Sequence, residues 1–226
     1  MQQLATRDYE GASGIAVDST GNVYITGYTQ GSLAGTNAGD DVWLAKYGSS
    51  GTQLWIQQLG TENNDRAKGV AVDSADNLYI TGSTEGSLGG INPAGDDVES
   101  DDAWLAKYDS NGDQLWLQQL GIKDDDEANG VAVDSAGNIY ITGYTDGFPD
   151  ESDRRMASAV LAQYNSDGEL MQIALKDNLR DGDYVECSGI AVDRAGNVYT
   201  TVDTYNFDFM TDVSNSDSLL RIYSYS

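Results

Sequence analysis

The amino-acid sequence predicts an all-β protein of the β-propeller class, built from four-stranded antiparallel blades. Three observations predict it: a phrase that occurs four times, four strand-like segments in each repeat, and no long apolar pattern at helical spacing. The phrase is GIAVDSTGNVYITGYT at residues 14–29, and it returns with changes at 69–84, 130–145 and 189–204. The repeats start 55, 61 and 59 residues apart, at Gly14, Gly69, Gly130 and Gly189.

Each repeat contains two pairs of strand-like segments. In the first pair, GIAVD and NVYITGYT flank DSTGN, whose Asp, Gly and Asn residues favour a tight hairpin turn. In the second pair, WLAKY at 43–47 and QLWIQQL at 53–59 flank the turn GSSGT. Four strands per unit favour a propeller blade. The main alternative, a β-solenoid, has shorter periods of about 20–30 residues.

Some residues of the repeat are expected to have purely structural roles. The aspartates that open the first turn of each unit are expected to cap that turn, and they are Asp18, Asp73, Asp134 and Asp193. The tryptophans recur at equivalent positions and are expected to pack between blades, and they are Trp43, Trp55, Trp104 and Trp116.

The repeats predict one propeller domain over residues 1–226. Its units are 14–68, 69–129, 130–188 and 189–226, the last completed by 1–13. The QQL of residues 2–4 matches the QQL of 57–59, so this segment is expected to be an outer strand that closes the ring. We expect a monomer of four blades. Two alternatives stay open: an eight-bladed dimer that exchanges terminal strands, and a fragment of a longer array.

The repeated phrase also resembles a known family. Together with DVWLAKY at 41–47 and GTQLWIQQLG at 51–60, it resembles the bacterial β-propeller repeat called the SBBP repeat and, more distantly, the NHL repeat. The resemblance covers essentially the whole chain. It is weakest in the fourth unit, where Thr200, Val202 and Asp203 replace the Ile, Gly and Tyr or Ser of the others. It implies a propeller fold, is compatible with an extracellular or cell-surface protein, and implies little about function.

Composition excludes several functional classes. Twelve Lys and Arg against 37 Asp and Glu give a net charge of −25, which argues against binding nucleic acid or anionic membrane surfaces. No apolar stretch has the length of a transmembrane helix or the form of a signal peptide, and the single cysteine, Cys187, leaves the compartment open. The sequence contains no histidine, which excludes Ser-His-Asp and Cys-His catalysis and the ordinary zinc sites.

The acidic residues are expected to gather on one face of the propeller. Two sets of loops that open on the same face hold 28 of the 37 acids: 5–13, 60–68, 121–129 and 176–188, and 30–42, 85–102, 146–158 and 203–217. Within them, some acids precede the starting glycine by four residues and others precede the third strand. These candidate binding residues are Glu10, Asp65 and Asp126, and Asp41, Asp102 and Asp217. We expect this acidic face to bind a protein or another cationic ligand.

A bound cation is a further expectation for the acidic loops. Calcium takes about six to eight oxygen ligands, so Asp65 and Asp126 are candidate Ca²⁺ ligands, although no cofactor is required. The alternative is that these residues only form tight turns. The leading functional hypothesis is a non-enzymatic binding or interaction propeller. A lectin-like carbohydrate-binding module and a metal-assisted lyase or hydrolase with carboxylate ligands stay open.

Overall fold

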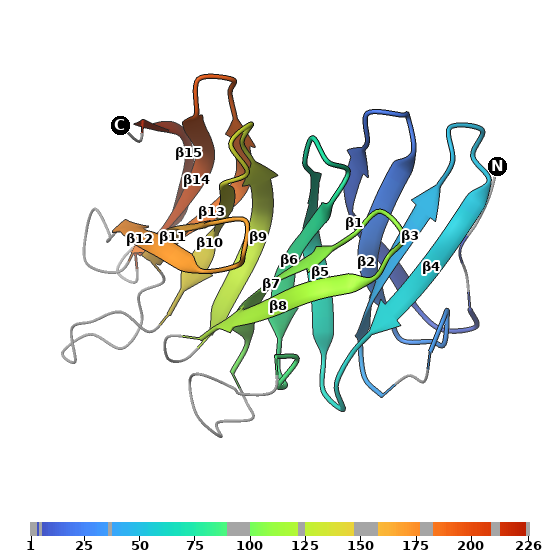
Figure 1. Cartoon of the computed structure of the whole chain (residues 1–226). Helices are drawn as coiled ribbons and strands as arrows, with labels where there is room; N and C mark the ends of the chain where they lie inside the picture. Colours follow the sequence, from blue (N-terminus) through green and yellow to red (C-terminus); the bar gives the residue numbers. More distant parts are fainter. Residues whose placement is uncertain are drawn as a thin grey trace.

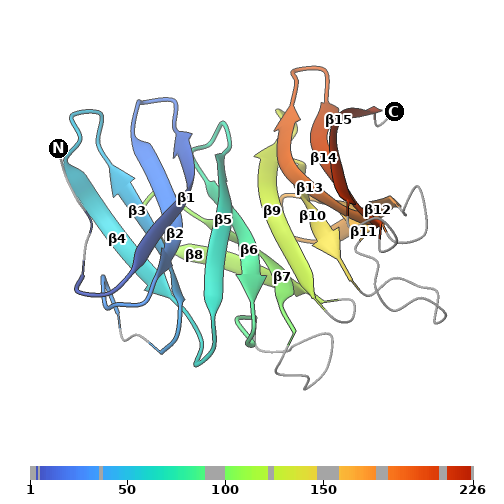
Figure 2. The same cartoon turned by 180° about the vertical axis from the view of Figure 1, so that it is seen from behind.

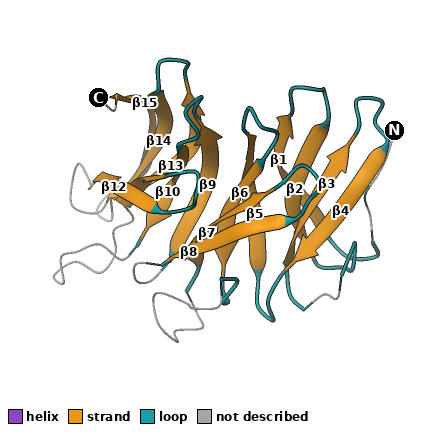
Figure 3. Ribbon diagram, in the orientation of Figure 1, coloured by secondary structure: helices purple, strands orange, loops and turns teal. Residues whose placement is uncertain are grey.

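Short strands joined by tight turns make up the regular structure of this protein. The computed structural model describes residues 4, 6–35, 38–89, 100–121, 125–146, 158–176, 183–208 and 213–224. Within these ranges every regular element is a β-strand (Figure 3). The all-β prediction is therefore confirmed.

The strands fall into four consecutive blades. Blade 1 contains β1 (Glu10–Val17), β2 (Val23–Thr29), β3 (Asp41–Tyr47) and β4 (Gln53–Leu59). Blade 2 contains β5 (Asp65–Val72), β6 (Leu78–Thr84), β7 (Asp102–Tyr108) and β8 (Gln114–Leu120). Blade 3 contains β9 (Asp126–Val133), β10 (Ile139–Thr145), β11 (Ser158–Tyr164) and β12 (Leu170–Lys176). Blade 4 contains β13 (Asp183–Val192), β14 (Asn197–Asp208) and β15 (Val213–Ser224).

Each blade is an antiparallel sheet whose strands pair in chain order. The four blades stand side by side in a curved row, with blade 1 and blade 4 at opposite ends (Figures 1 and 2). The first strands β1, β5, β9 and β13 are neighbours across the blade junctions. Closure of the ring by residues 2–4 stays a prediction, because residues 1–3 lie outside the described part of the chain.

The first strand of each blade is longer than the sequence pattern indicates. It begins at Glu10, four residues before Gly14, and the same extension occurs in blades 2 and 3. A β-bulge between Ala12 and Gly14 shifts the register there, so the extended segment continues the pairing with β2. A Cβ on Gly27 would collide with the carbonyl oxygen of Gly11. That close approach explains the glycine of the ITG segment.

The first hairpin turn of each blade is capped by its aspartate, as the sequence predicts. In blade 2, one carboxylate oxygen of Asp73 accepts hydrogen bonds from the backbone N–H of Ala75 and of Asn77, at 2.8 and 2.9 Å. The other oxygen accepts from the Asn77 amide at 2.8 Å. These charge-assisted bonds outweigh the desolvation of the partly buried carboxyl and lower the pKa of Asp73 below its usual value.

The hydrophobic core lies between the blades and is built from alternate residues of the strands. At the junction of blades 1 and 2, Tyr24 and Leu44 of blade 1 pack with Leu78, Ile80 and Trp104 of blade 2. The junction of blades 2 and 3 repeats this arrangement with equivalent residues. We call the side of a blade that packs on the preceding blade its front face, and the side that packs on the following blade its rear face.

Three of the four tryptophans pack at the junctions between blades, as expected. Trp43 is buried too, but it lines the cavity on the front face of blade 1, and its indole N–H donates to carbonyl oxygens of its own blade. Trp104 is fully buried, and its indole N–H donates to the carbonyl oxygen of Ser83 at 3.0 Å. Trp55 stands on the outer strand with its ring 6.0 Å from that of Tyr24, and Trp116 lies 6.2 Å from Tyr79. Through these aromatic contacts, the fourth strand of a blade packs against the core between that blade and the next one.

Candidate functional site

The first strands of the blades carry polar side chains at two positions that differ from blade to blade. The position three residues before the starting glycine is occupied by Gly11, Arg66, Glu127 and Glu186. The position directly before it is occupied by Ser13, Lys68, Asn129 and Ser188. These four strands face the viewer in Figure 2, as successive neighbours along the row of blades. The two positions therefore form a polar row that crosses the junctions.

Hydrogen bonds link this polar row from blade 2 to blade 4. The Lys68 ammonium forms an ion pair with the Glu127 carboxylate and donates to the Asn129 side-chain oxygen at 3.1 Å. Asn129 in turn donates from its amide nitrogen to the carbonyl oxygen of Cys187 at 3.1 Å. These contacts fix the side chains of Lys68, Glu127 and Asn129 on the first strands of blades 2 and 3.

Charge is balanced at the junction of blades 1 and 2. The Arg66 guanidinium is 2.6 Å from the Asp40 carboxylate and lies over the Tyr28 ring, 5.5 Å from its centroid. Asp40 is buried, and its backbone N–H donates to the Asn64 side-chain oxygen at 3.2 Å. A buried carboxylate is stable here because the Arg66 guanidinium supplies both a compensating positive charge and a hydrogen bond, from Nε at 2.7 Å.

The next junction has the same geometry with different charges. Asp101 takes the place of Asp40, and its backbone N–H donates to the Asp125 carboxylate at 3.1 Å. Where Arg66 stands in blade 2, blade 3 has Glu127. Burial, together with the negative charges of Glu127, Glu85 and Asp125, raises the pKa of Asp101 to about 6, against a smaller opposing effect of Arg66. We call Glu85, Asp101, Asp125 and Glu127 the central acidic cluster.

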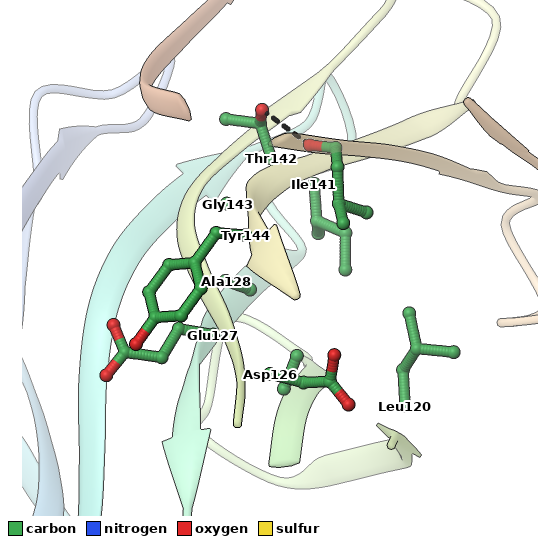
Figure 4. Close-up of a pocket in the computed structure, with 10 residues that line it drawn as sticks. Leu120, Asp126, Glu127, Ala128, Ile141, Thr142, Gly143 and Tyr144 are labelled. Carbon is green, nitrogen blue, oxygen red and sulfur yellow. Dashed lines mark hydrogen bonds between the residues drawn. The ribbon is translucent and has the colours of Figure 1, made fainter. Parts of the chain in front are cut away.

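Figure 4 shows one member of this cluster, Glu127, together with a pocket at the junction of blades 2 and 3. Glu127 and the ring of Tyr144 lie next to each other on one side of the strand pair β9–β10. Asp126 points to the other side, toward Leu120. Neighbouring acids on one strand therefore have different surroundings, because successive side chains point to opposite faces.

The structure corrects the prediction that the repeated acids form an exposed face. Asp41, Asp65, Asp102 and Asp126 are buried, with at most 2% of their surface exposed. A partner protein cannot contact these side chains in the folded state. Glu10 is partly exposed and accepts a hydrogen bond from the Thr6 backbone N–H at 3.1 Å. The side chain of Asp217 lies outside the described residues.

The buried acids hold loops in place. Asp65 accepts hydrogen bonds from the backbone N–H of Thr61 at 2.5 Å and from its hydroxyl at 3.0 Å, and a further one from the Thr84 hydroxyl. Asp102 accepts one from the Gln119 amide at 2.7 Å, while its Oδ1 has no hydrogen-bond partner among the residues that the structure describes. Burial is the largest influence on both carboxyls and raises the pKa of Asp65 and of Asp102. Turn and loop chemistry therefore accounts for these residues.

A multi-carboxylate metal centre is not assembled by the side chains that the structure describes. In that part of the chain no three Asp, Glu or Cys residues come together in a way that could hold a metal ion. Asp65 and Asp126 belong to different blades, at equivalent positions of β5 and β9. Calcium binding by these two residues stays a prediction from the sequence.

Sequence reasoning missed the central acidic cluster because it searched for acids that repeat. Asp65 and Asp126 occupy the same position of the repeat, where Asp65 holds the preceding loop through Thr61. The signal that could have located the cluster is the opposite one, a position of the repeat where the charge changes between units. Arg66 and Glu127 occupy such a position. A repeat position whose charge changes from unit to unit is one at which the blade fold does not require a particular side chain.

One structural property bears on location. Among the residues that the structure describes, no helix is long and apolar enough to cross a membrane.

Two relatives of known sequence match part of this chain and are much longer. This chain is 34% identical to the regulatory protein FlaEY of Caulobacter vibrioides over 107 residues. The aligned region covers 46% of this chain and 11% of FlaEY. This chain is also 26% identical over 186 residues to the uncharacterized WD repeat-containing protein L264 of Acanthamoeba polyphaga mimivirus, covering 71% of the chain and 13% of that protein. The chain thus spans only a small part of either relative.

A solved structure supports the fold, and a family profile gives the membership. A protein of unknown function from Bacteroides caccae superposes with a TM-score of 0.50 at 8% identity, covering 92% of this chain and 61% of that one. At this identity the likeness concerns the fold alone. The profile of the SBBP β-propeller repeat matches residues 2–34, 54–89, 115–149 and 180–209, more than half of the sequence. With the four repeated sheets, these matches show that the chain belongs to the SBBP β-propeller repeat family.

Proposed function

We propose that this chain is a non-enzymatic binding propeller whose central acidic cluster receives a cationic group, a lysine or arginine side chain of a partner protein. The observation that carries the proposal is the exchange of charge between two equivalent junctions. Arg66 is paired with Asp40 at the first junction, whereas the equivalent position at the second is Glu127, which is itself paired with Lys68. Among the described residues no ion pair neutralises Asp101, and the nearby charges of Glu127, Glu85 and Asp125 add to its own.

Arg66 illustrates how a cation fits such a place. Its guanidinium combines a charge-assisted hydrogen bond to Asp40, 2.7 Å from Nε, with an aromatic ring beneath it. At the second junction the residue equivalent to Tyr28 is Ser83, and the aromatic ring there is that of Tyr144, which lies beside Glu127 on blade 3 itself (Figure 4). A partner side chain that brought a positive charge there would oppose the burial and the repulsion that together raise the pKa of Asp101.

The net charge of −25 supports the same proposal at longer range. A strongly negative protein attracts cationic partners and speeds their association, and the effect weakens as salt is added. Binding rather than catalysis is proposed because the sequence has no histidine and the described acids of the repeat are engaged in capping loops.

A hexa-arginine peptide tests the proposal, with its affinity measured by isothermal titration calorimetry at two salt concentrations. We expect binding that weakens with salt and that Glu127→Arg reduces at least tenfold, because this substitution puts a cation at the position that Arg66 has at the first junction and leaves Lys68 without its carboxylate partner. Asp101→Asn should also weaken binding. The matched control is Glu169→Arg, which changes the net charge equally in an exposed hairpin turn.

The comparison of the two arginine variants decides the outcome. If Glu127→Arg and Glu169→Arg reduce the affinity equally, the peptide responds only to net charge and the cluster is not a binding site. If hexa-arginine does not bind at low salt, the proposed function is wrong.

A further inference from the structure

The front face of blade 1 is an uncovered copy of a surface that is buried at the other junctions. Ile15 and Val17 are 68% and 59% exposed. Their equivalents in blade 3 are Val131, which is 8% exposed, and Val133, which is partly buried against the junction core. Ala12 is exposed as well, whereas its equivalent Ala67 is fully buried. The residue types match, so the difference arises from what covers them.

Cavities at equivalent places show the same contrast. At the junction of blades 2 and 3, the space lined by Leu120, Ala128 and Ile141 has a volume of about 10 Å³ (Figure 4). On blade 1 the equivalent residues Leu4, Ala12 and Ile25 line an open cavity of about 470 Å³. Ala103 on the rear face of blade 2 lines the small cavity, whereas all the described residues that line the large one, apart from Leu4, belong to blade 1 itself. The apolar cavity of blade 1 is therefore a junction without its second half.

The second hairpin turn of blade 1 lacks a neighbour in the same way. The equivalent turn of blade 2 is contacted by blade 1. The Lys46 ammonium of blade 1 donates to the carbonyl oxygen of Ser110 at 2.9 Å, and the Gln57 amide of blade 1 donates to the carbonyl oxygen of Gly112 at 2.9 Å. A Cβ on Gly112 would lie 3.3 Å from the Trp55 ring. The equivalent glycine of blade 1 is Gly51. Apart from the residues next to it in the chain, no described atom would lie within 4 Å of a Cβ at this position.

The rear face of blade 4 is the complementary uncovered surface. Thr201 is exposed, while its equivalents Thr26 and Thr81 in blades 1 and 2 are fully buried. The starting glycines show the same difference. A Cβ on Gly14 would lie 3.1 Å from the backbone nitrogen of Val70 in the next blade. One on Gly189 would meet only Thr201 of its own blade among the described atoms.

We propose that these two faces bind each other between two copies of the chain, with the front face of blade 1 against the rear face of blade 4 of the second copy. Each chain carries both halves of an interface that it already forms between its consecutive blades. Its own two halves lie at opposite ends of the row (Figures 1 and 2). Two such contacts close a head-to-tail dimer with eight blades, a number within the usual range of about four to eight.

The mass of the intact chain in solution is the first test, measured by light scattering or sedimentation. We expect about 48 kDa, twice the 24.2 kDa of one chain. Ile15→Asp should reduce the mass to that of one chain, because it places a charge in the apolar contact. The matched control is Leu115→Asp on blade 2, whose side chain is similarly exposed at 53% and which should stay dimeric. Both residues are exposed within one chain, so both variants should keep the far-ultraviolet circular dichroism of the parent.

A disulfide between two copies is the second test. At each junction, the starting glycine of one blade lies next to the residue that follows the starting glycine of the next blade. Gly130, for example, lies next to Ile190, and Gly14 and Gly69 have the equivalent neighbours. By this rule Gly189 should adjoin Ile15 of the second copy. In a Cys187→Ala background, Gly189→Cys with Ile15→Cys should form a disulfide-linked dimer on oxidation. Gly130→Cys with Ile190→Cys should form a disulfide within one chain and is the positive control.

Each result of these tests decides the proposal. A chain that remains at 24.2 kDa at high concentration would overturn it. If the Gly189→Cys, Ile15→Cys variant formed its disulfide inside a single chain, the proposal would also be overturned, because the ring would then close with four blades. A covalent dimer from this variant, absent from the Gly130 and Ile190 control, would establish the head-to-tail contact.

Discussion

The hydroxyl of Tyr79 donates a hydrogen bond to the Asp73 carboxylate at 3.0 Å, and this bond joins a hairpin turn to the core between two blades. Asp73 caps the turn, and the ring of Tyr79 is buried in the junction of blades 2 and 3. The pair recurs in each blade at 3.0 to 3.2 Å, as Tyr24–Asp18, Tyr140–Asp134 and Tyr199–Asp193. Local turn geometry and packing between blades are thus coupled at three junctions, through Tyr24, Tyr79 and Tyr140.

Replacing Asp73 with Ala should lower the free energy of unfolding by about 3 kcal/mol. The substitution leaves the Tyr79 hydroxyl and two backbone N–H groups without their charged acceptor. Urea denaturation measures the change, and Asp113→Ala in an exposed turn is the control. Because the folded pKa of Asp73 is lowered, its contribution is present above the unfolded pKa and is lost as pH falls through the folded value. A loss below about 0.5 kcal/mol, the lower limit for one ordinary hydrogen bond, would show that water replaces the carboxylate.

Replacing Asp76 with Gly should stabilise the protein by about 1 kcal/mol. Asp76 has a φ of 61°, whereas the equivalent positions in the other three blades are Gly21, Gly137 and Gly196, with φ of 85° to 87°. A left-handed conformation costs roughly 1–2 kcal/mol for a residue with a Cβ, and the greater freedom of unfolded glycine offsets part of the gain. The exposed contact from Ser19 to Asp76, at 3.2 Å, would be lost. A lower thermal midpoint would show that this contact outweighs the backbone strain.

The stability conferred by Asp101→Asn should depend on pH. The folded pKa of Asp101, about 6, is above the ordinary value of 3.8, so the folded state binds its proton more tightly than the unfolded state. Above pH 6 the charged carboxylate opposes folding, and the neutral variant should have the higher thermal midpoint. The difference should shrink as pH falls from about 6 toward about 4, because the wild-type carboxyl then becomes protonated in the folded state. Midpoints measured across this range and above it check the trend, and Asp113→Asn should show no comparable one.

Calcium and sodium chloride at matched ionic strength should give the same thermal midpoint. The Asp65 carboxylate already accepts hydrogen bonds from Thr61 and Thr84, and a cation would have to displace them. Screening of the −25 charge should stabilise the fold in both salts. A midpoint that rises only with calcium, and no longer rises in Asp65→Asn, would support calcium binding at this residue. Bound ligand at a hundredfold excess over Kd would add about 2.7 kcal/mol.

The sequence by itself determined the blades. Turn chemistry is local, so DSTGN and its repeats predicted the hairpins and the capping by Asp18 and Asp73. The equivalent tryptophans predicted the junctions, because a large apolar side chain that recurs once per blade must pack in the same place each time. The start of β1 was predicted four residues too late, since the bulge before Gly14 interrupts the alternation on which such a prediction depends.

Only the tertiary structure decided which acids are exposed and which faces are covered. Asp126 and Glu127 are adjacent carboxylic acids of β9, yet the first is buried on the side of Leu120 and the second is only partly buried, beside Tyr144 (Figure 4). A sequence records the residue type at each position but not the direction of a side chain after a bulge. The exposure of Ile15 likewise depends on the neighbouring blade, because its equivalent Val131 belongs to the same repeat and is buried. Burial is a property of pairs of blades, and it appears only when they are placed side by side.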